Sequence, residues 1–201
     1  GFPYGTIPLW CKGGTRLQDN IIVKPSVEKQ FDRFLRQGRV LFFSAPCGFG
    51  KTAVAEALLS SREALRLPAD SAGSKLPSAE ADWQILLLDD LQDMQEEQDW
   101  NALCELIRAC PERRFVLLSR GAPLWSLMAF QYTGLMTVLE ADDLLFDADD
   151  VRRLLRLYGV EAAASEIDGI LKESVGYPLG VAITARCMSP DKPWTPELVA
   201  R

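Results

Sequence analysis

Histidine is absent from this 201-residue sequence, and cysteine occurs only five times. Structural zinc sites combine cysteine and histidine at short spacing, and disulfide frameworks use an even number of cysteines. Neither pattern is present, so we expect free thiols and no zinc site. The cysteines are Cys11, Cys47, Cys104, Cys110 and Cys187.

Long apolar runs and an excess of basic residues are also missing. No stretch approaches the roughly 20 apolar residues of a membrane-spanning helix, and no charged leader followed by an apolar segment opens the sequence. Lysine and arginine number 22 against 28 aspartates and glutamates, which gives a formal charge of −6. A general nucleic-acid surface needs a basic stripe. We therefore expect a soluble, cytoplasmic protein that binds neither membrane nor nucleic acid with this part of its chain.

The most informative segment covers residues 45–52 and reads Ala-Pro-Cys-Gly-Phe-Gly-Lys-Thr, after an apolar run at 40–43. It matches the phosphate-binding motif GxxxxGK[ST] except at the first position, where Ala45 replaces a glycine that only eases the exit from the strand. The backbone N–H groups of such a loop turn inward on a polyphosphate, and Gly48 and Gly50 permit the close approach. An ordinary Gly/Pro turn before a helix is the alternative, and the order of strand, loop and helix argues against it.

Two side chains of this loop have expected roles. Lys51 would reach the terminal phosphates, and Thr52 would place its hydroxyl on Mg²⁺ at the positive N-terminal end of a helix over residues 51–61. The sequence therefore predicts a nucleotide with Mg²⁺ at this loop. The candidate nucleotide-binding residues here are Pro46, Cys47, Gly48, Phe49, Gly50, Lys51, Thr52 and Ala53.

A second motif, Ile-Leu-Leu-Leu-Asp-Asp, covers residues 85–90. Its continuous apolar run is typical of a strand buried on both faces of a parallel sheet. The two carboxylates fall at the carboxyl end of that strand, where ligands bind in open α/β sheets. We expect Asp89 to hold Mg²⁺ beside Thr52, directly or through water, and Asp90 to orient the attacking water. Two solvated acids at a polar turn are the alternative.

Arg120 is the third candidate, because it follows a predicted strand at 115–118. In a parallel sheet it arrives at the same edge as the phosphate loop, where its guanidinium would stabilise charge on the terminal phosphate. An ion pair with a surface carboxylate is the alternative. Lys51, Asp90 and Arg120 are therefore the candidate catalytic residues.

The apolar patterning predicts an α/β fold: a P-loop NTPase domain with a five-stranded, mostly parallel sheet flanked by helices. We place this domain at residues 1–143, with an irregular opening segment at 1–20, and a small, truncated helical subdomain at 144–201. The expected strands are 40–43, 64–67, 85–90, 115–118 and 136–139, and the expected helices are 25–37, 51–61, 99–110, 147–158, 162–175 and 181–188. Ser26 is the expected N-cap of the first helix, 68–80 an expected mobile linker and 176–180 an expected turn.

The order of these motifs, together with Leu-Leu-Ser-Arg-Gly at 117–121 and Gly-Tyr-Pro-Leu-Gly at 176–180, resembles that of signal-transducing (STAND-class) P-loop ATPases. In particular, residues 20–187 are similar to the ATPase module of large ATP-binding transcriptional regulators of the LuxR type. The resemblance implies ATP or ADP with Mg²⁺ bound between the two parts of the chain. It also implies that Pro178 approaches the base or sugar and that the segment near Val23, Lys24 and Pro25 contacts adenine.

The same resemblance implies a regulatory switch. The expected partners are the DNA-binding and sensor domains of a full-length regulator, and a second copy on activation. The sequence departs from typical members in the short stretch between the phosphate loop and Asp89, and it has no helix-turn-helix or sensor repeat. We expect slow hydrolysis, because the sequence shows no obvious arginine finger beyond Arg120 and such a residue is often supplied by a second molecule.

Three other functions are alternatives to this switch. One is a nucleotide-binding pseudo-ATPase that acts as an interaction module. A small P-loop phosphotransferase would need a lid with several arginines after the sheet, whereas residues 141–150 are rich in aspartate. A DNA-translocating ATPase is disfavoured by the acidic charge balance.

Overall fold

The computed structural model of this protein describes residues 21–68, 76–188 and 194–195. The opening segment 1–20, Cys11 and the middle of the expected mobile linker lie outside the described residues. So do the last residues of the predicted helical subdomain.

A five-stranded sheet forms the centre of the molecule, and every pair of neighbouring strands is parallel. The strands are β1 (Val40–Ser44), β2 (Leu65–Pro68), β3 (Ile85–Asp89), β4 (Arg114–Ser119) and β5 (Met136–Glu140). Their order in the sheet is β2-β3-β4-β1-β5. The predicted α/β class and five-stranded sheet are confirmed, and the sheet is wholly rather than mostly parallel. Because β4 lies between β1 and β3, its carboxyl end separates the phosphate loop from the acidic end of β3.

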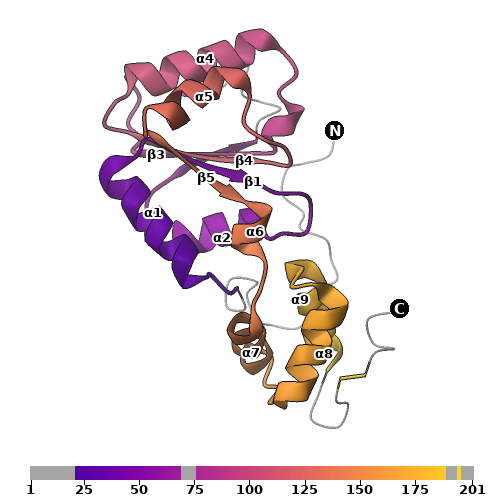
Figure 1. The fold of residues 1–201 in the computed structure, drawn as a ribbon. Helices are drawn as coiled ribbons and strands as arrows, with labels where there is room; N and C mark the ends of the chain where they lie inside the picture. Colours follow the sequence, from indigo (N-terminus) through magenta and orange to yellow (C-terminus); the bar gives the residue numbers. More distant parts are fainter. Residues whose placement is uncertain (1–20, 69–75, 189–193, 196–201) are drawn as a thin grey trace, which may run out of the picture.

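Helices cover both faces of the sheet, as Figure 1 shows. They are α1 (Pro25–Gln37), α2 (Lys51–Leu58) and α6 (Ala141–Leu144) on one face, and α4 (Glu97–Ala109) and α5 (Trp125–Tyr132) on the other. Alternate residues of β1 point to opposite faces of the sheet. Leu41 and Phe43 pack with α1 and α2, whereas Val40 and Phe42 pack with α4 and α5. The continuous apolar runs of the strands therefore follow from burial on both faces.

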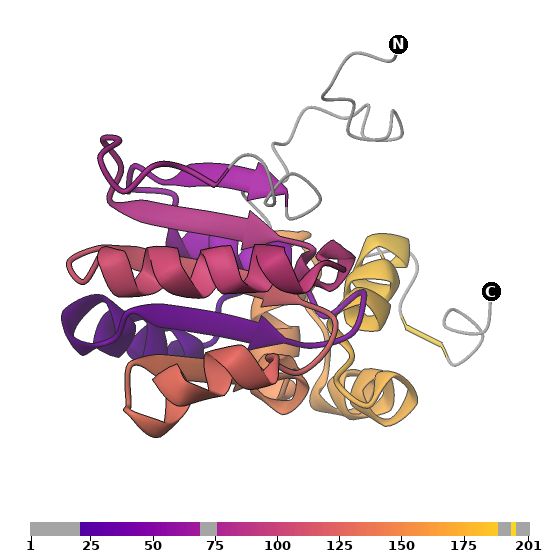
Figure 2. The same cartoon turned by 90° about the horizontal axis from the view of Figure 1, so that it is seen from above.

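A separate group of three helices follows the sheet: α7 (Ala148–Leu157), α8 (Ala164–Ser174) and α9 (Pro178–Cys187). These helices have a core of their own, which includes Val151, Ile167 and Val181. In Figure 2, α8 and α9 lie beyond the carboxyl ends of the strands. Among the described helices, none has the length and apolar character needed to cross a membrane.

One predicted N-cap and one predicted helix start are wrong, and proline explains both. Ser26 is not the N-cap of α1, because Lys24 holds that position without a side-chain cap and Pro25 is the first helical residue. Helix α9 begins at Pro178, three residues before the predicted start at 181, so much of the expected turn at 176–180 is helical. Proline has no N–H to lose and a fixed φ suited to the first helical position, so it begins these helices rather than preceding them.

Two helices were not predicted at all. Helix α5 is apolar with little periodicity, and the side chains of Trp125 and Tyr132 at its two ends are exposed. Helix α6 is a single turn of four residues. Helix α2 ends at Leu58, earlier than the predicted 61. Hydrophobic periodicity could not identify α5 or α6, because α5 has no polar face and α6 is too short to show a period.

Candidate functional site

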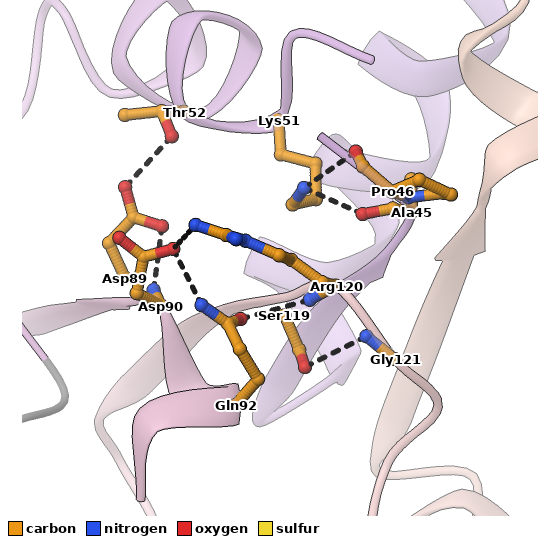
Figure 3. A network of polar contacts seen from close by, with 10 residues as sticks. All are labelled: Ala45, Pro46, Lys51, Thr52, Asp89, Asp90, Gln92, Ser119, Arg120 and Gly121. Atoms are coloured by element: carbon orange, nitrogen blue, oxygen red, sulfur yellow. Dashed lines mark hydrogen bonds and ion pairs between the residues drawn. The ribbon is translucent and has the colours of Figure 1, made fainter. Parts of the chain in front are cut away.

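The phosphate loop leaves β1 and turns directly into α2 at the carboxyl edge of the sheet (Figure 3). Gly48 has a φ of 83° and Gly50 a φ of 77°, both in the left-handed region. Other residues adopt this region only with strain, so both glycines are needed for the path of the loop.

The donor groups of this loop are available to a ligand. Within the part of the chain that the structure describes, the backbone N–H groups from Gly48 through Thr52 make no hydrogen bond. The last two belong to the first turn of α2, where N–H groups have no partner inside the helix and the helix dipole is positive. Successive free N–H groups at a helix N-terminus form a binding site for anions such as phosphate.

Lys51 lies across its own loop. Its Nζ donates to the carbonyl oxygens of Ala45 at 2.6 Å and Pro46 at 3.0 Å. Burial lowers the pKa of Lys51, while the carboxylate of Asp89 favours the charged form and opposes that shift. The ammonium thus adds positive charge to the free N–H groups, and it must leave its two carbonyl partners to reach a terminal phosphate.

Thr52 and Asp89 meet at the predicted metal position. The Thr52 hydroxyl donates to Oδ2 of Asp89 over 2.8 Å. Neighbouring oxygen ligands of an octahedral Mg²⁺ with bonds of about 2.1 Å lie about 3 Å apart, so the two oxygens already have a suitable separation. The described residues contain no group of three or more histidine, cysteine or acidic side chains that could hold a metal.

Asp90 and Arg120 also come together, but they contact each other. Arg120 Nη2 lies 3.5 Å from Oδ1 of Asp90, and both side chains are about half exposed. Gln92 links the pair, because its Nε2 donates to Asp90 Oδ1 at 2.7 Å and its Oε1 accepts from the backbone N–H of Arg120 at 3.0 Å. Asp90 has a left-handed φ of 57°, which is strained for a residue with a side chain. The strand ends of β3 and β4 are therefore tied together by side chains.

Sequence reasoning missed Gln92. Its role depends on the short 3₁₀ turn Leu91–Asp93 after β3 and on the placement of β4 next to that strand. A polar residue two positions after the paired acids was the only signal in the sequence.

The helical subdomain contacts the phosphate loop through the start of α9. The Tyr177 hydroxyl donates to the carbonyl oxygen of Cys47 at 3.0 Å, and the Leu179 N–H donates to that of Gly48 at 3.2 Å. The rings of Tyr177 and Phe49 meet edge to face, with centroids 5.3 Å apart. Pro178, predicted from the resemblance, stands between these two contacts. Tyr177 was not predicted, although an aromatic residue in the Gly-Tyr-Pro-Leu-Gly segment was a visible signal.

The segment predicted to contact adenine is tied to α7. Lys24 Nζ donates to the carbonyl oxygen of Leu145 and lies 3.7 Å from the buried carboxylate of Asp150. Arg153 donates to the Val23 carbonyl oxygen at 3.3 Å and lies 3.5 Å from the same carboxylate. Burial raises the pKa of Asp150, and Lys24 and Arg153 partly offset this effect.

A cavity of about 450 Å³ lies beside this segment. It is lined by Pro25, Asp147, Asp149, Asp150, Arg152, Arg153 and Arg156.

No protein-family model and no curated protein matches this sequence. Solved structures do match, among them RuvB of Thermotoga maritima, a Holliday junction branch migration motor (TM-score 0.62, 15% identity, covering 89% of this chain and 68% of that one). Domain III of the replication initiation protein DnaA of the same organism matches with a TM-score of 0.58 and 14% identity, over 90% of this chain and 92% of that one. A Walker-type ATPase of Pyrococcus abyssi matches with a TM-score of 0.57 and 11% identity, over 82% and 67% of the two chains.

These similarities establish the fold. One of the three is described as a Walker-type ATPase, and this chain shares the α/β architecture of all three, with its phosphate loop after β1. This protein therefore has the fold of a P-loop NTPase domain. Identities of 11 to 15% carry no information on substrate or partner.

Proposed function

We propose that this chain binds ATP with Mg²⁺ between its α/β part and its helical subdomain, and hydrolyses the nucleotide slowly as a regulatory switch. One observation carries the proposal: the free N–H groups from Gly48 to Thr52 lie at the N-terminus of α2 beside Lys51 and the Thr52–Asp89 pair. Donors, a cation and a pair of hard oxygen ligands in one place suit a metal-bound polyphosphate.

Each side chain has a proposed role in that site. Lys51 turns from the carbonyl oxygens of Ala45 and Pro46 onto the terminal phosphates. Thr52 and Asp89 hold Mg²⁺, which neutralises charge on the phosphate oxygens. Arg120 moves from Asp90 toward the transferred phosphate, and Asp90 then orients the attacking water.

Slow turnover follows from the arrangement of the last two residues. Asp90 is engaged by both Gln92 and Arg120, so its carboxylate orients a water only after Arg120 has left it. This exchange adds a step before chemistry, which suits a switch better than a metabolic enzyme.

The switch itself rests on the contact of α9 with the phosphate loop. Because Tyr177 and Leu179 bond to the loop that would hold the phosphates, nucleotide state and subdomain position are linked. Moving a population from mostly off to mostly on needs a preference of about 10⁴-fold, or about 5.5 kcal/mol, which nucleotide and partner domains would share. That the switch belongs to a LuxR-type transcriptional regulator, with sensor and DNA-binding domains and self-association, is supported by motif order alone.

Titration of ATP and ADP in the presence of Mg²⁺ tests the proposal. Lys51→Ala removes the one ammonium at the loop, so we expect at least a tenfold rise in the Kd for ATP. The matched control is Lys29→Ala on the exposed face of α1, which should bind like the parent. Unchanged ATP affinity in Lys51→Ala would remove the lysine from the site, and tighter binding of GTP than of ATP would contradict the adenine assignment.

A pseudo-ATPase is the second candidate, and the pairing of Asp90 with Arg120 favours it. If Arg120 never leaves Asp90, the protein binds ATP without turnover and acts through its shape. Single-turnover measurements on the parent and on Asp90→Asn separate the two functions. Turnover lost in Asp90→Asn supports the switch, whereas binding without turnover in both proteins supports the pseudo-ATPase.

A further inference from the structure

The two hydrogen bonds from the start of α9 to the phosphate loop both use carbonyl oxygens of the loop's backbone. Tyr177 and Leu179 donate to the carbonyl oxygens of Cys47 and Gly48. In a planar trans peptide the C=O of one residue and the N–H of the next point in opposite directions. No cis peptide occurs in the described residues. The N–H groups of Gly48 and Phe49 therefore point away from α9.

This geometry separates two faces of the phosphate loop. The helical subdomain contacts the face with the carbonyl oxygens. The free N–H groups, which are proposed to bind the phosphates, lie on the opposite face. Tyr177 thus does not compete with a phosphate for these donors. It fixes the peptide between Cys47 and Gly48, and Leu179 fixes the next one.

Tyr177 is held firmly enough to orient the loop. Its own N–H donates to the Ser174 carbonyl oxygen at 2.9 Å, and Pro178 follows it as the first residue of α9. Gly176, before it, accepts at 2.8 Å from the N–H of Phe146, in the segment that joins the sheet to α7. A Cβ on Gly176 would lie 2.5 Å from the Phe146 carbonyl oxygen, so this junction is packed tightly.

Gly48 shows how close the approach is. An added Cβ at this position would lie 1.8 Å from the Tyr177 hydroxyl oxygen, which no real contact allows. Phe49 is partly buried against the core of the α/β part, and its ring and that of Tyr177 meet edge to face. The tyrosine therefore connects the phosphate loop to both parts of the molecule.

We propose that Tyr177 is a positioning residue that orients the N–H groups of Gly48 and Phe49 toward the phosphates while the helical subdomain is seated on the loop. The position of the helical subdomain then sets the affinity for nucleotide, because Tyr177 orients the loop only while the subdomain contacts it. The inference rests on the proposed nucleotide site and adds the device that couples the subdomain to it.

Tyr177→Phe in the full chain tests the inference, because it removes the hydroxyl and keeps the ring. Loss of one neutral hydrogen bond is expected to raise the Kd for ADP about 2- to 10-fold. Tyr177→Ala also removes the ring contact with Phe49, so its effect should be larger. The matched control is Tyr158→Phe, in the core of the helical subdomain, which should bind ADP like the parent.

Amide hydrogen exchange in the nucleotide-free protein is a second measurement, and it does not require the proposed nucleotide site. The Leu179 N–H reports whether α9 is seated on the loop, and the Ile170 N–H, inside α8, reports the integrity of the subdomain. In Tyr177→Phe we expect several-fold faster exchange at Leu179 and no change at Ile170. Tyr158→Phe should change neither.

The outcomes are distinguishable. Unchanged exchange at Leu179 in both Tyr177 variants would overturn the seating role. Faster exchange with ADP affinity within twofold of the parent would overturn the coupling to nucleotide. Exchange that rises equally at Leu179 and Ile170 would show a merely structural role. If the parent itself binds no ADP, the proposed function fails, and the exchange comparison still decides whether Tyr177 seats α9.

Discussion

Gly48 and Gly50 both need a left-handed backbone, but the space around them differs. Both have a left-handed φ, but a Cβ on Gly50 would meet nothing within 4 Å, whereas one on Gly48 would strike the Tyr177 hydroxyl. Alanine at Gly50 therefore lowers the free energy of unfolding only through the strain of its left-handed backbone, by about 1–2 kcal/mol. Alanine at Gly48 has the same backbone strain and a collision in addition.

This difference gives a prediction for urea unfolding. Gly48→Ala should lower the free energy of unfolding more than Gly50→Ala does, because Tyr177 must shift. In a Tyr177→Ala background the collision is gone, so the difference between the two alanine variants should disappear. Equal destabilisation in the parent background would show that Tyr177 does not approach the loop as described.

The candidate site could be predicted from the sequence only where the chemistry is local. Lys51 and Thr52 belong to one short loop, and Asp89 is marked by the end of an apolar strand, so their positions follow from the motif and the parallel sheet. Gln92 and Tyr177 act on residues far away in the chain, at Arg120 and Cys47. No pattern near either residue reveals these partners, because packing of separate elements brings them together.

At the scale of elements, the strands were predicted better than the helix ends. A run such as Leu86 to Leu88 is apolar because both faces of the sheet are covered, so the physical cause and the sequence signal coincide. Helix starts depend on a single backbone group. Helix α1 has the predicted bounds but begins at Pro25 without the predicted Ser26 cap, and Pro178 begins α9 instead of lying in a turn before it.

Helix α7, unlike α1 and α9, begins with a side-chain cap. The Asp147 side chain accepts from the N–H groups of Asp149 at 2.9 Å and Asp150 at 3.0 Å, and the Asp150 side chain accepts in return from the N–H of Asp147 at 3.2 Å. The hydrogen bond from the Asp150 N–H is the main reason that the pKa of Asp147 is lowered. This reciprocal arrangement fixes where the helical subdomain begins.

Asp147→Ala should therefore lower the free energy of unfolding by about 1 kcal/mol at neutral pH. A lowered folded-state pKa contributes stability that is fully present above the unfolded value of about 3.9 and is lost as the pH falls through the folded value. The gap between variant and parent should thus narrow in acid. Urea unfolding from pH 7 to pH 3 measures it, with Asp168→Ala on the exposed surface of α8 as control. A gap that stays constant with pH would contradict the charged cap.

At the scale of the whole molecule, two sets of polar contacts among the described residues join the helical subdomain to the α/β part. One is Tyr177 and Leu179 on the phosphate loop, and the other is Lys24 and Arg153 around the buried carboxylate of Asp150. The second set involves no residue of the phosphate loop, so in the proposed switch it would stay in place while the first set changed with the nucleotide. Motion about the Asp150 attachment would then change the face of α9 that meets the loop.

The central claim is that the phosphate loop and the end of β3 together hold a metal-bound nucleotide. Calorimetric titration of ATP with and without Mg²⁺, on the parent and on Asp89→Ala, tests it most directly, with Asp82→Ala on the exposed surface as control. We predict that Mg²⁺ tightens ATP binding at least tenfold in the parent and in Asp82→Ala, and leaves it unchanged in Asp89→Ala. ATP binding that is absent from the parent, or equally dependent on Mg²⁺ in Asp89→Ala, would contradict the account.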